Sequence, residues 1–439
     1  MKARFLIPLL LMAAPALAQE PSPVTPGSPL RLTLQEALGR ALAGNPALGR
    51  TRVEVDALQA QVDVAFSSIL PKIAFQGNYT RNDQSVTFGE GDDARTLLAE
   101  NDWSYRVTLA QPIYAGNRER KAIRQARLGV TSARFGVSDA EERLLLGVAS
   151  SYLAAVQAEA LLTVEQLNLD LARRRRDQAQ IFFEAGETTR VDVLRAEADT
   201  KGAERRIAAA RQARETAMGD LRLGLGVEGP LAVAPPGDFL PALPAEAALL
   251  AEAEANRPEL AQARTALEIA KLEVAKQKGA FLPLITADGA WVKQRASFPT
   301  DQYGQLSIRL SVPIYSSGEL KGKVVLARER LQQAELRVQE VQQVIREQVH
   351  QALVELESAG ASLQLAREQL TAAEAEHGQA SELYRAQELT SLELESAETS
   401  LAEARRAVAG SQLDHDLAEL RAWAAAGLLK KTISPEGAQ

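Results

Sequence analysis

The residues that could carry acid–base, nucleophilic or metal chemistry are scattered along this sequence. Its three histidines, His350, His377 and His415, lie far apart and lack i, i+4 ligand partners, so we expect surface or helix-seam positions rather than a zinc site. There is no cysteine, hence no thiolate ligand or disulfide. Carboxylates are spread along predicted helix faces, and no nucleophile arrangement is present. We therefore predict no enzyme activity, no cofactor and no metal.

One glycine pattern resembles a nucleotide-binding loop. Residues 224–229 fit G-x-G-x-x-G, but such a loop must follow a strand and open a helix. This one follows a long predicted helix and runs into Pro230 and a proline-rich segment. We interpret it as the end of a helix.

A run of four arginines, Arg173 to Arg176, points to all sides of its predicted helix at about 100° per residue. Solvated positions and salt bridges between subunits are favoured over a contact with anionic groups of a partner protein. The formal net charge is −7, and −9 without Lys2 and Arg4 of the N-terminal segment. This acidity argues against a nucleic-acid partner.

The N-terminus has the layout of an export signal, with Lys2 and Arg4 before an apolar run and Ala16-Leu17-Ala18 before Gln19. We expect residues 1–18 to be cleaved. No later run approaches the eighteen apolar residues that a membrane helix needs, so we expect entry into a bilayer only through strands. Aromatic residues make up only 5% of the chain, which favours narrow alanine-rich seams over one large core.

Internal repetition is the dominant feature of the chain. Pro112-Ile113-Tyr114 recurs as Pro313-Ile314-Tyr315, 201 positions later, and Leu70-Pro71 recurs as Leu282-Pro283. The chain is therefore two copies of one unit. We predict a proline-rich N-terminal segment (19–30), a first repeat (31–229), a proline-rich linker (230–244), a second repeat (245–429) and a C-terminal tail (430–439).

Each repeat is predicted to begin with a helix, which in the first repeat runs from the capping box at Thr33 to Leu70. Two alternating segments follow, at about residues 73–80 and 103–110, and again at 285–291 and 306–312. One face of these segments is apolar with aromatic ends, and the other is polar, as in membrane barrel strands. An ordinary soluble hairpin is the alternative for any single pair. The polar face offers Arg106, Thr108 and Arg309 as residues lining a barrel lumen.

Very long helices follow the two Pro-Ile-Tyr junctions. Apolar residues recur at alternating spacings of four and three from Ile345 to Ala373, which predicts a coiled-coil seam. The first repeat keeps seven of nine such positions between Leu144 and Ala172, with Ser151 and Glu165 as exceptions. A helix over residues 117–185 is roughly 100 Å long. Each repeat should therefore end in a helical hairpin with an exposed tip.

Four strands cannot close a membrane barrel, and open strand edges are not tolerated in lipid. We therefore expect a homotrimer, because three chains supply twelve strands. The predicted fold class is mainly α with a membrane β-barrel, in which long coiled-coil helices form a trimeric α-barrel and each chain gives four β-strands.

These features resemble the TolC-like outer-membrane factors of bacterial efflux pumps and type I secretion systems. The resemblance lies in LTLQEALGRALAGNPAL near the start, the Leu-Pro and Pro-Ile-Tyr repeats, and the tip sequences AGETTRVDVLRAEAD and YRAQELTSLELESAETSLAEA. It implies a trimeric exit duct in the outer membrane with a periplasmic helical tunnel. The implied partners are a periplasmic adaptor (membrane fusion protein), an inner-membrane transporter and outer-membrane lipid.

The resemblance also implies roles for tip residues. Gly186 and Asp192 occupy the positions of the family's tip glycine and of the aspartate six residues later. Glu393 and Ser396 fall where a relative has two entrance aspartates, and Glu395 lies one position away. Leu389 replaces a basic latch residue, and Gln387 replaces a glycine. The implied adaptor-docking residues are Gly186, Thr188, Thr189, Arg190, Val191, Ala386, Gln387, Leu389 and Thr390, and the implied gate is formed by Asp192, Glu393, Glu395 and Ser396.

Two alternatives remain at this stage. Three copies of Glu393 converging on an axis would attract cations, or the residue is simply a solvated helix-surface charge. The chain as a whole is either an exit duct or a structural or adhesive envelope coiled coil whose strands form a small head without a pore.

Overall fold

The computed structural model describes residues 30–433 except residues 90, 92, 93, 236–239, 297–299 and 387. The expected signal peptide (1–18), nearly all of segment 19–30 and the end of the expected tail lie outside these residues. Residues 430–433 belong to a short helix, α9 (Leu429–Ile433).

The two repeats supply similar sets of elements. The first comprises β1 (Leu30–Leu32), α1 (Leu34–Gly44), α2 (Pro46–Phe66), a 3₁₀ turn (Ser67–Ile69), β2 (Lys72–Arg81), β3 (Val86–Phe88), β4 (Arg95–Leu98), β5 (Asn101–Ala115), α3 (Arg118–Glu184) and α4 (Arg190–Leu225). The predicted linker contains β6 (Leu231–Val233), and the second repeat comprises α5 (Glu246–Asn256), α6 (Pro258–Gly279), β7 (Leu284–Gln294), β8 (Gln302–Ser311), α7 (Glu319–Arg385) and α8 (Ser391–Ala425).

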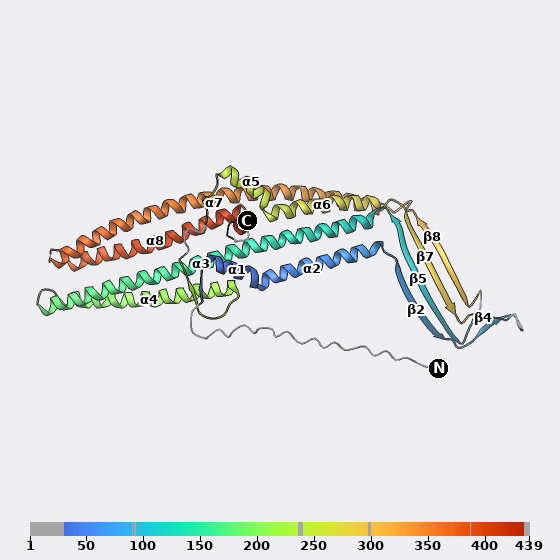
Figure 1. Cartoon of the computed structure of the whole chain (residues 1–439), viewed down its shortest axis with the longest axis horizontal. Coiled ribbons are helices and arrows are strands. Elements are labelled where there is room, and N and C mark those ends of the chain that lie inside the picture. Colours follow the sequence, from blue (N-terminus) through green and yellow to red (C-terminus); the bar gives the residue numbers. More distant parts are fainter. Residues whose placement is uncertain are drawn as a thin grey trace, which may run out of the picture.

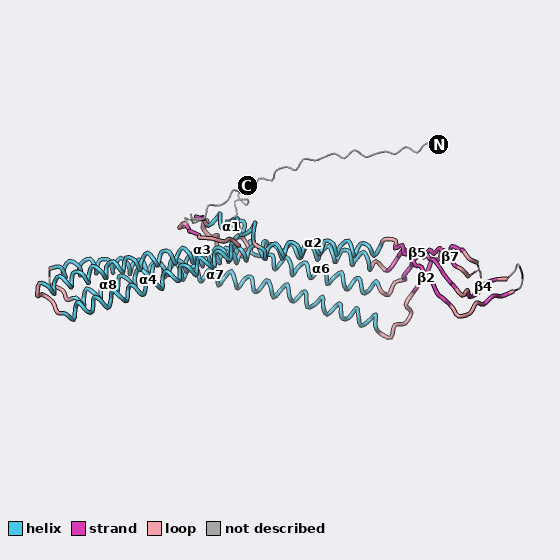
Figure 2. The backbone as a smooth tube through the Cα atoms, turned by 90° about the horizontal axis from the view of Figure 1, so that it is seen from below, coloured by secondary structure: helices cyan, strands magenta, loops and turns pink. Residues whose placement is uncertain are grey.

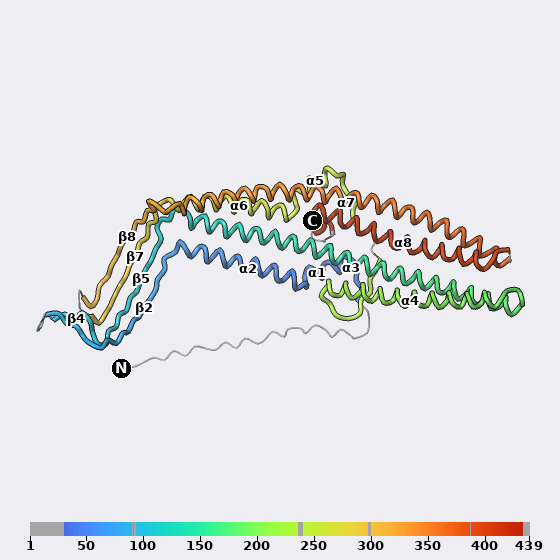
Figure 3. Tube along the Cα trace, turned by 180° about the vertical axis from the view of Figure 1, so that it is seen from behind, coloured from blue at the N-terminus to red at the C-terminus, as the bar shows by residue number. Residues whose placement is uncertain are grey.

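The molecule is long and narrow. The sheet lies at one end, and the α3–α4 and α7–α8 hairpin tips lie together at the other (Figure 1). Seen from below, α2, α3, α6 and α7 run toward the sheet, and the β3–β4 pair extends beyond it (Figure 2). The view from behind shows the sheet strands turning away from the direction of the helices (Figure 3). The 67 residues each of α3 and α7 span roughly 100 Å.

The helical segment at the start of each repeat is broken in two, so the expected single helix from Thr33 to Leu70 is wrong. Asn45 ends α1 and caps α2, since its side chain accepts hydrogen bonds from the N–H groups of Ala47 (2.9 Å) and Leu48 (3.3 Å). Pro46 follows at the first helical position, where its missing N–H costs nothing. Pro258 starts α6 in the same way.

The main sheet has the order β2-β5-β7-β8 and is antiparallel throughout. Its register pairs Phe75 with Val107 and Val107 with Trp291, while Ile285 pairs with Leu310. Apolar side chains therefore share one face across all four strands, as the alternating pattern predicts. This face is exposed in the single chain, with Phe75 68% and Leu310 64% accessible.

The two Pro-Ile-Tyr junctions differ in structure, although their sequences predict one setting. In the first, β5 continues through the junction to Ala115, with a register shift between Pro112 and Tyr114. Residues 312–318 of the second lie outside any strand. After β5 the chain turns at Gly116 (φ 65°), where a Cβ would lie 2.1 Å from the carbonyl oxygen of Gly279. Only glycine fits this approach of the two repeats.

The main core lies where the repeats meet, midway along the helices. Short strands β1 and β6 pair in parallel there, and the fully buried Tyr152 ties them together. Its hydroxyl lies 2.9 Å from the carbonyl oxygen of Leu32 and 2.7 Å from that of Ala234, and accepts from the Ala234 N–H (3.1 Å). Ile345 and Val349 of the predicted seam are also buried in this core.

One window of α3 is long and apolar enough to cross a membrane, contrary to the expectation that no later segment meets this criterion. Of that window, 39% is buried within the chain. Because α3 packs against α2, α4, α6 and α8, we assign it to the helical body.

Candidate functional site: the hairpin tips

Both hairpin tips are built from a helix end, a short turn and a capped helix start. In the first tip, Gly186 adopts a left-handed conformation (φ 79°), and the next N–H, that of Glu187, donates to the carbonyl oxygen of Phe182 (2.8 Å). Such a turn closes the end of α3 and favours glycine. Gly186 is thus explained by local backbone geometry.

Thr189 caps α4 in a capping box with Asp192. The N–H of Asp192 donates to the Thr189 hydroxyl (3.4 Å), and the Thr189 N–H donates back to the Asp192 carboxylate (3.3 Å). This exchange satisfies two donors that a helix start leaves free.

Asp192 accepts hydrogen bonds from beyond its capping box as well. Its Oδ2 accepts from the hydroxyls of Thr189 (2.7 Å) and Thr188 (2.8 Å). Its Oδ1 accepts from the hydroxyl of Ser391, 3.2 Å away at the start of α8. The threonine hydrogen bonds lower the pKa of the Asp192 carboxyl, so it is ionised at neutral pH. This carboxylate connects the two tips.

The second tip repeats the capping box with Thr390 and Glu393. Glu393 accepts from the N–H (2.9 Å) and hydroxyl (2.7 Å) of Thr390, and its own N–H donates to that hydroxyl (3.4 Å). These bonds lower the pKa of the Glu393 carboxyl. Glu393 is exposed, so a local cap on α8 is its role within one chain.

An apolar contact joins the tips beside this polar link. The rings of Phe182 and Tyr384 lie 5.8 Å apart, and the half-buried Leu389 packs in the same cluster as the buried Leu394. Burial raises the pKa of the Tyr384 hydroxyl. Leu389, expected at the position of a basic latch, therefore contributes packing.

The other expected tip residues occupy the two turns and the first turns of α4 and α8. Arg190, Val191, Ala386 and Ser396 are exposed, Glu395 is half-buried, and Gln387 lies outside the described residues. The structure thus brings Asp192 and Ser391 together from different repeats, whereas Glu393 bonds within its own tip.

The sequence reasoning missed two sets of contacts of functional interest. Ser391 carried no motif, and nothing in the sequence pairs it with Asp192. A buried cluster farther from the tips joins Arg175 to Asp199 and Glu398. The arginine run had pointed to salt bridges between subunits, whereas Arg175 pairs within one chain. A second signal was Glu165, a charged residue within an apolar seam, which is buried and pairs with Arg406 (2.6 Å).

At the opposite end of the molecule, the register places Arg106, Thr108 and Arg309 on the polar face of the sheet. Arg106 pairs with Gln76, Thr108 with Ala74 and Ala290, and Arg309 with Thr286. None of these three belongs to the apolar face defined by Phe75, Val107 and Leu310.

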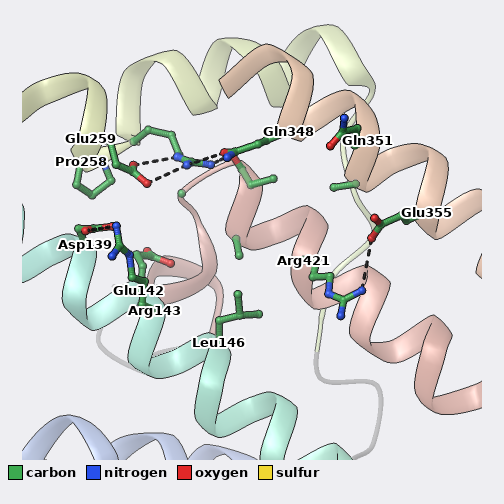
Figure 4. Close-up of a pocket in the computed structure, with 15 residues that line it drawn as sticks. Asp139, Glu142, Arg143, Leu146, Pro258, Glu259, Gln348, Gln351, Glu355 and Arg421 are labelled. Atoms are coloured by element: carbon green, nitrogen blue, oxygen red, sulfur yellow. Dashed lines mark hydrogen bonds and ion pairs between the residues drawn. The ribbon is translucent and has the colours of Figure 1, made fainter. Parts of the chain in front are cut away.

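A cavity of about 430 Å³ lies between α3, α6, α7 and α8 (Figure 4). Arg257 beside it donates to both carboxylate oxygens of Glu259 (2.9 and 3.0 Å), to Gln348 (2.9 Å) and to the carbonyl oxygen of Ala425 (2.9 Å). Burial raises the pKa of Glu142 on the opposite wall. The arrangement joins the start of α6 to α7 and α8, which is an architectural role.

Within the described part of the chain, no three His, Asp or Glu side chains gather as a metal site. The glycine pattern at 224–229 ends α4, because Gly226 takes the left-handed conformation (φ 65°) of a helix C-cap. The interpretation as a helix end is confirmed.

Comparison with known proteins gives matches over nearly the whole length. The family model described as outer membrane efflux protein matches residues 37–227 and 249–427. The outer membrane efflux protein BepC of Brucella suis is 25% identical over 390 residues, covering 88% of this chain and 82% of that protein. The alkaline protease secretion protein AprF of Pseudomonas aeruginosa is 27% identical over 328 residues, covering 69% of this chain and 65% of that protein.

The fold is also found among solved structures. The open state of the MtrE outer membrane channel of Neisseria gonorrhoeae superimposes with a TM-score of 0.75 at 21% identity, covering 90% of this chain and 88% of that chain.

Proposed function

The chain belongs to the outer membrane efflux protein family, and on that premise we propose that three copies form a passive exit duct across the outer membrane and periplasm. The duct performs no bond chemistry. Its mechanism consists of passage and gating, and the energy comes from a partner transporter.

The observation that carries this proposal is the four-stranded sheet with an exposed apolar face. Its outer strands, β2 and β8, each have one neighbour among the described strands. Unpaired strand edges are not tolerated in lipid, so the edge of β2 must pair with the edge of β8 in a neighbouring copy. Three copies close twelve strands, an even number within the range of membrane barrels.

Closing the sheet with its apolar face toward lipid turns the polar face inward. Arg106, Thr108 and Arg309 then line the lumen of the barrel. Each appears three times in the trimer, and because Arg106 lies opposite Val292 and Arg309 opposite Thr286, the six arginines would line the lumen at two levels and affect ion passage.

The tips form the periplasmic entrance in this arrangement. Asp192 and Ser391 hold the two hairpins of one chain together, while Glu393, Glu395 and Ser396 lie around the first turns of α8 as the gate. The exposed turn residues, including Arg190, Val191 and Ala386, are the docking surface for a periplasmic adaptor. Adaptor contact would draw the hairpins apart and widen the entrance.

The adaptor links the duct to an inner-membrane transporter. BepC is named an efflux protein and AprF a protease secretion protein. Both uses are compatible with a duct of this kind, because the transporter selects the substrate and the duct conducts it.

The native mass of the mature protein, measured after detergent extraction of outer membranes, tests the proposal. We expect a mass three times that of the chain, and ion conductance when the trimer is placed in a planar bilayer. A water-soluble monomer, or a trimer without conductance, would refute the duct and favour an envelope coiled coil without a pore.

A further inference from the structure

Of the four consecutive arginines on α3, Arg175 alone is buried, with 8% of its surface accessible. It forms an ion pair with Asp199 on α4, and its Nη1 lies 3.1 Å from the Glu398 carboxylate on α8. One guanidinium thus binds a carboxylate from each hairpin. A planar group with several fixed N–H donors suits this double contact better than an ammonium does.

A second ionic layer lies farther from the tips on the same face of α3. Glu165, 6% accessible, accepts from Arg406 of α8 (2.6 and 3.3 Å) and lies 3.5 Å from Arg206 of α4. Between the layers, Asn168 is 7% accessible, and neither polar atom of its side chain has a hydrogen-bond partner. The spacing 165, 168, 175 aligns the three residues along one helix face.

The space between the hairpins at this level is incompletely filled. A cavity of about 350 Å³ is lined by α3, α4 and α8, including Asn168, Ala172, Arg175 and Glu398. It is large enough for water, and Asn168 offers partners for it. The contact between the hairpins is therefore polar here and has room for water.

Each hairpin has its own apolar seam, which does not depend on this contact. Leu169 and Ala172 of α3 pack against Ala203 and Ile207 of α4. In the other hairpin, Ala373 packs with Leu401 and Ala404, where Leu171 of α3 also reaches. Separation of the hairpins would leave most of both seams intact.

The polar contact contributes little net stability. Burying charges costs about as much as their pairing returns, but removal of one partner leaves the others uncompensated. Burial raises the pKa of Glu398, although the nearby Arg175 opposes this. Removal of Arg175 would therefore leave this buried carboxylate without its partner cation.

The second repeat has no buried arginine at the corresponding position. The position that corresponds to Arg175, 201 residues later, is Glu376, which is exposed. The long-hairpin architecture therefore does not require a buried arginine at this level.

We propose that Arg175 is a positioning residue of the entrance, whose guanidinium fixes the α3–α4 hairpin against α8 and thereby keeps the duct narrow. The effect on the duct rests on the proposed function; the joining of the hairpins does not. Loss of Arg175 leaves Asp199 and Glu398 as facing carboxylates that repel each other, so the hairpins separate.

The test uses the full-length trimer and a single cysteine, which the cysteine-free chain makes possible. Asn168→Cys places a thiol at a position that is 7% accessible, lines the cavity and lies outside the apolar α3–α4 seam. In this background, Arg175→Gln should raise the rate of maleimide labelling at least about tenfold, and should raise the conductance of the resting channel. Arg176→Gln is the matched control, since the partly exposed Arg176 forms its ion pair in the described part of the chain with the neighbouring Asp177 and not with α8.

Two further variants complete the experiment. Adding Glu398→Gln to Arg175→Gln should lower the labelling rate again, because it removes the repulsion. If Arg175→Gln fails to assemble into a trimer, Arg175→Lys tests the proposal instead. Its labelling rate should exceed that of the single-cysteine protein that retains Arg175. Unchanged labelling in the assembled arginine variants would overturn the proposal. A trimer that labels as expected but never conducts would refute the duct and leave the role of Arg175 standing.

Discussion

The two hairpin tips share one design but use it differently. Each begins its returning helix with a threonine cap and an acidic residue three positions later, Thr189 with Asp192 and Thr390 with Glu393. Asp192 also accepts hydrogen bonds from Thr188 and Ser391, whereas Glu393 bonds only Thr390 among the described hydrogen bonds. At the position of Thr188, the second tip has Leu389, which packs in the apolar cluster between the tips.

This difference shows how a duplicated unit acquires two roles. The capping boxes start the helices and are retained in both copies. The residues beside them have diverged, so that one acidic residue fastens the hairpins and the other remains exposed. Asp192 is therefore expected to affect closure, and Glu393 is expected to affect the charge of the entrance.

The largest effect is expected for Asp192→Ala compared with Glu393→Ala. The first change removes the acceptor of bonds from two threonines and Ser391, so amide hydrogen exchange in the first turns of both α4 and α8 should accelerate on the order of tenfold. The second should accelerate exchange in α8 only. Equal effects of the two variants on both helices would contradict the division of roles.

Acid should weaken the same link. Because the pKa of Asp192 is lowered in the folded tip, its contribution is fully present above the ordinary aspartate pKa of about 3.9. The contribution is lost as the pH falls through the lowered value. In a Glu398→Gln background, which removes the carboxylate with the raised pKa, resting conductance should therefore stay constant between pH 8 and 5 and rise only below about pH 4. A transition near neutrality would show that another group controls closure.

Removing the caps should have smaller and similar effects in the two tips. Thr189→Ala and Thr390→Ala should each cost about 1 kcal/mol of local helix stability, because each leaves a backbone N–H of a helix start without its acceptor. Hydrogen exchange measures this directly, with the corresponding serine variants as controls that retain a hydroxyl. A much larger loss in one tip would mean that its threonine has a partner beyond the cap.

The smallest structural effect is expected for Glu393→Gln. Glutamine can serve in a capping box, so the tip should retain its stability while three charges leave the trimer entrance. Cation preference in single-channel recordings should fall. Unchanged selectivity would remove Glu393 from the gate and leave it a solvated helix cap.

Much of the fold could be predicted because its signals are local. The alternation of residues 73–80 and 103–110 predicted strands β2 and β5, and the register then confirmed which side chains share a face. The break at Asn45-Pro46 was missed, although a cap residue followed by proline is itself a helix-start signal. The different courses of the two Pro-Ile-Tyr junctions could not be predicted, because nearly identical residues meet different neighbours in the two repeats.

In the candidate site, too, local features could be predicted from the sequence and contacts between distant segments could not. The sequence alone determined the two repeats, the helix period, the strand alternation and the position of both tips, since each depends on residues a few positions apart. Only the tertiary structure decided that Ser391 reaches Asp192 and that Arg175, one of four identical neighbours, lies between Asp199 and Glu398. Those contacts join helices that are far apart in the chain, and burial is set by which helices pack together.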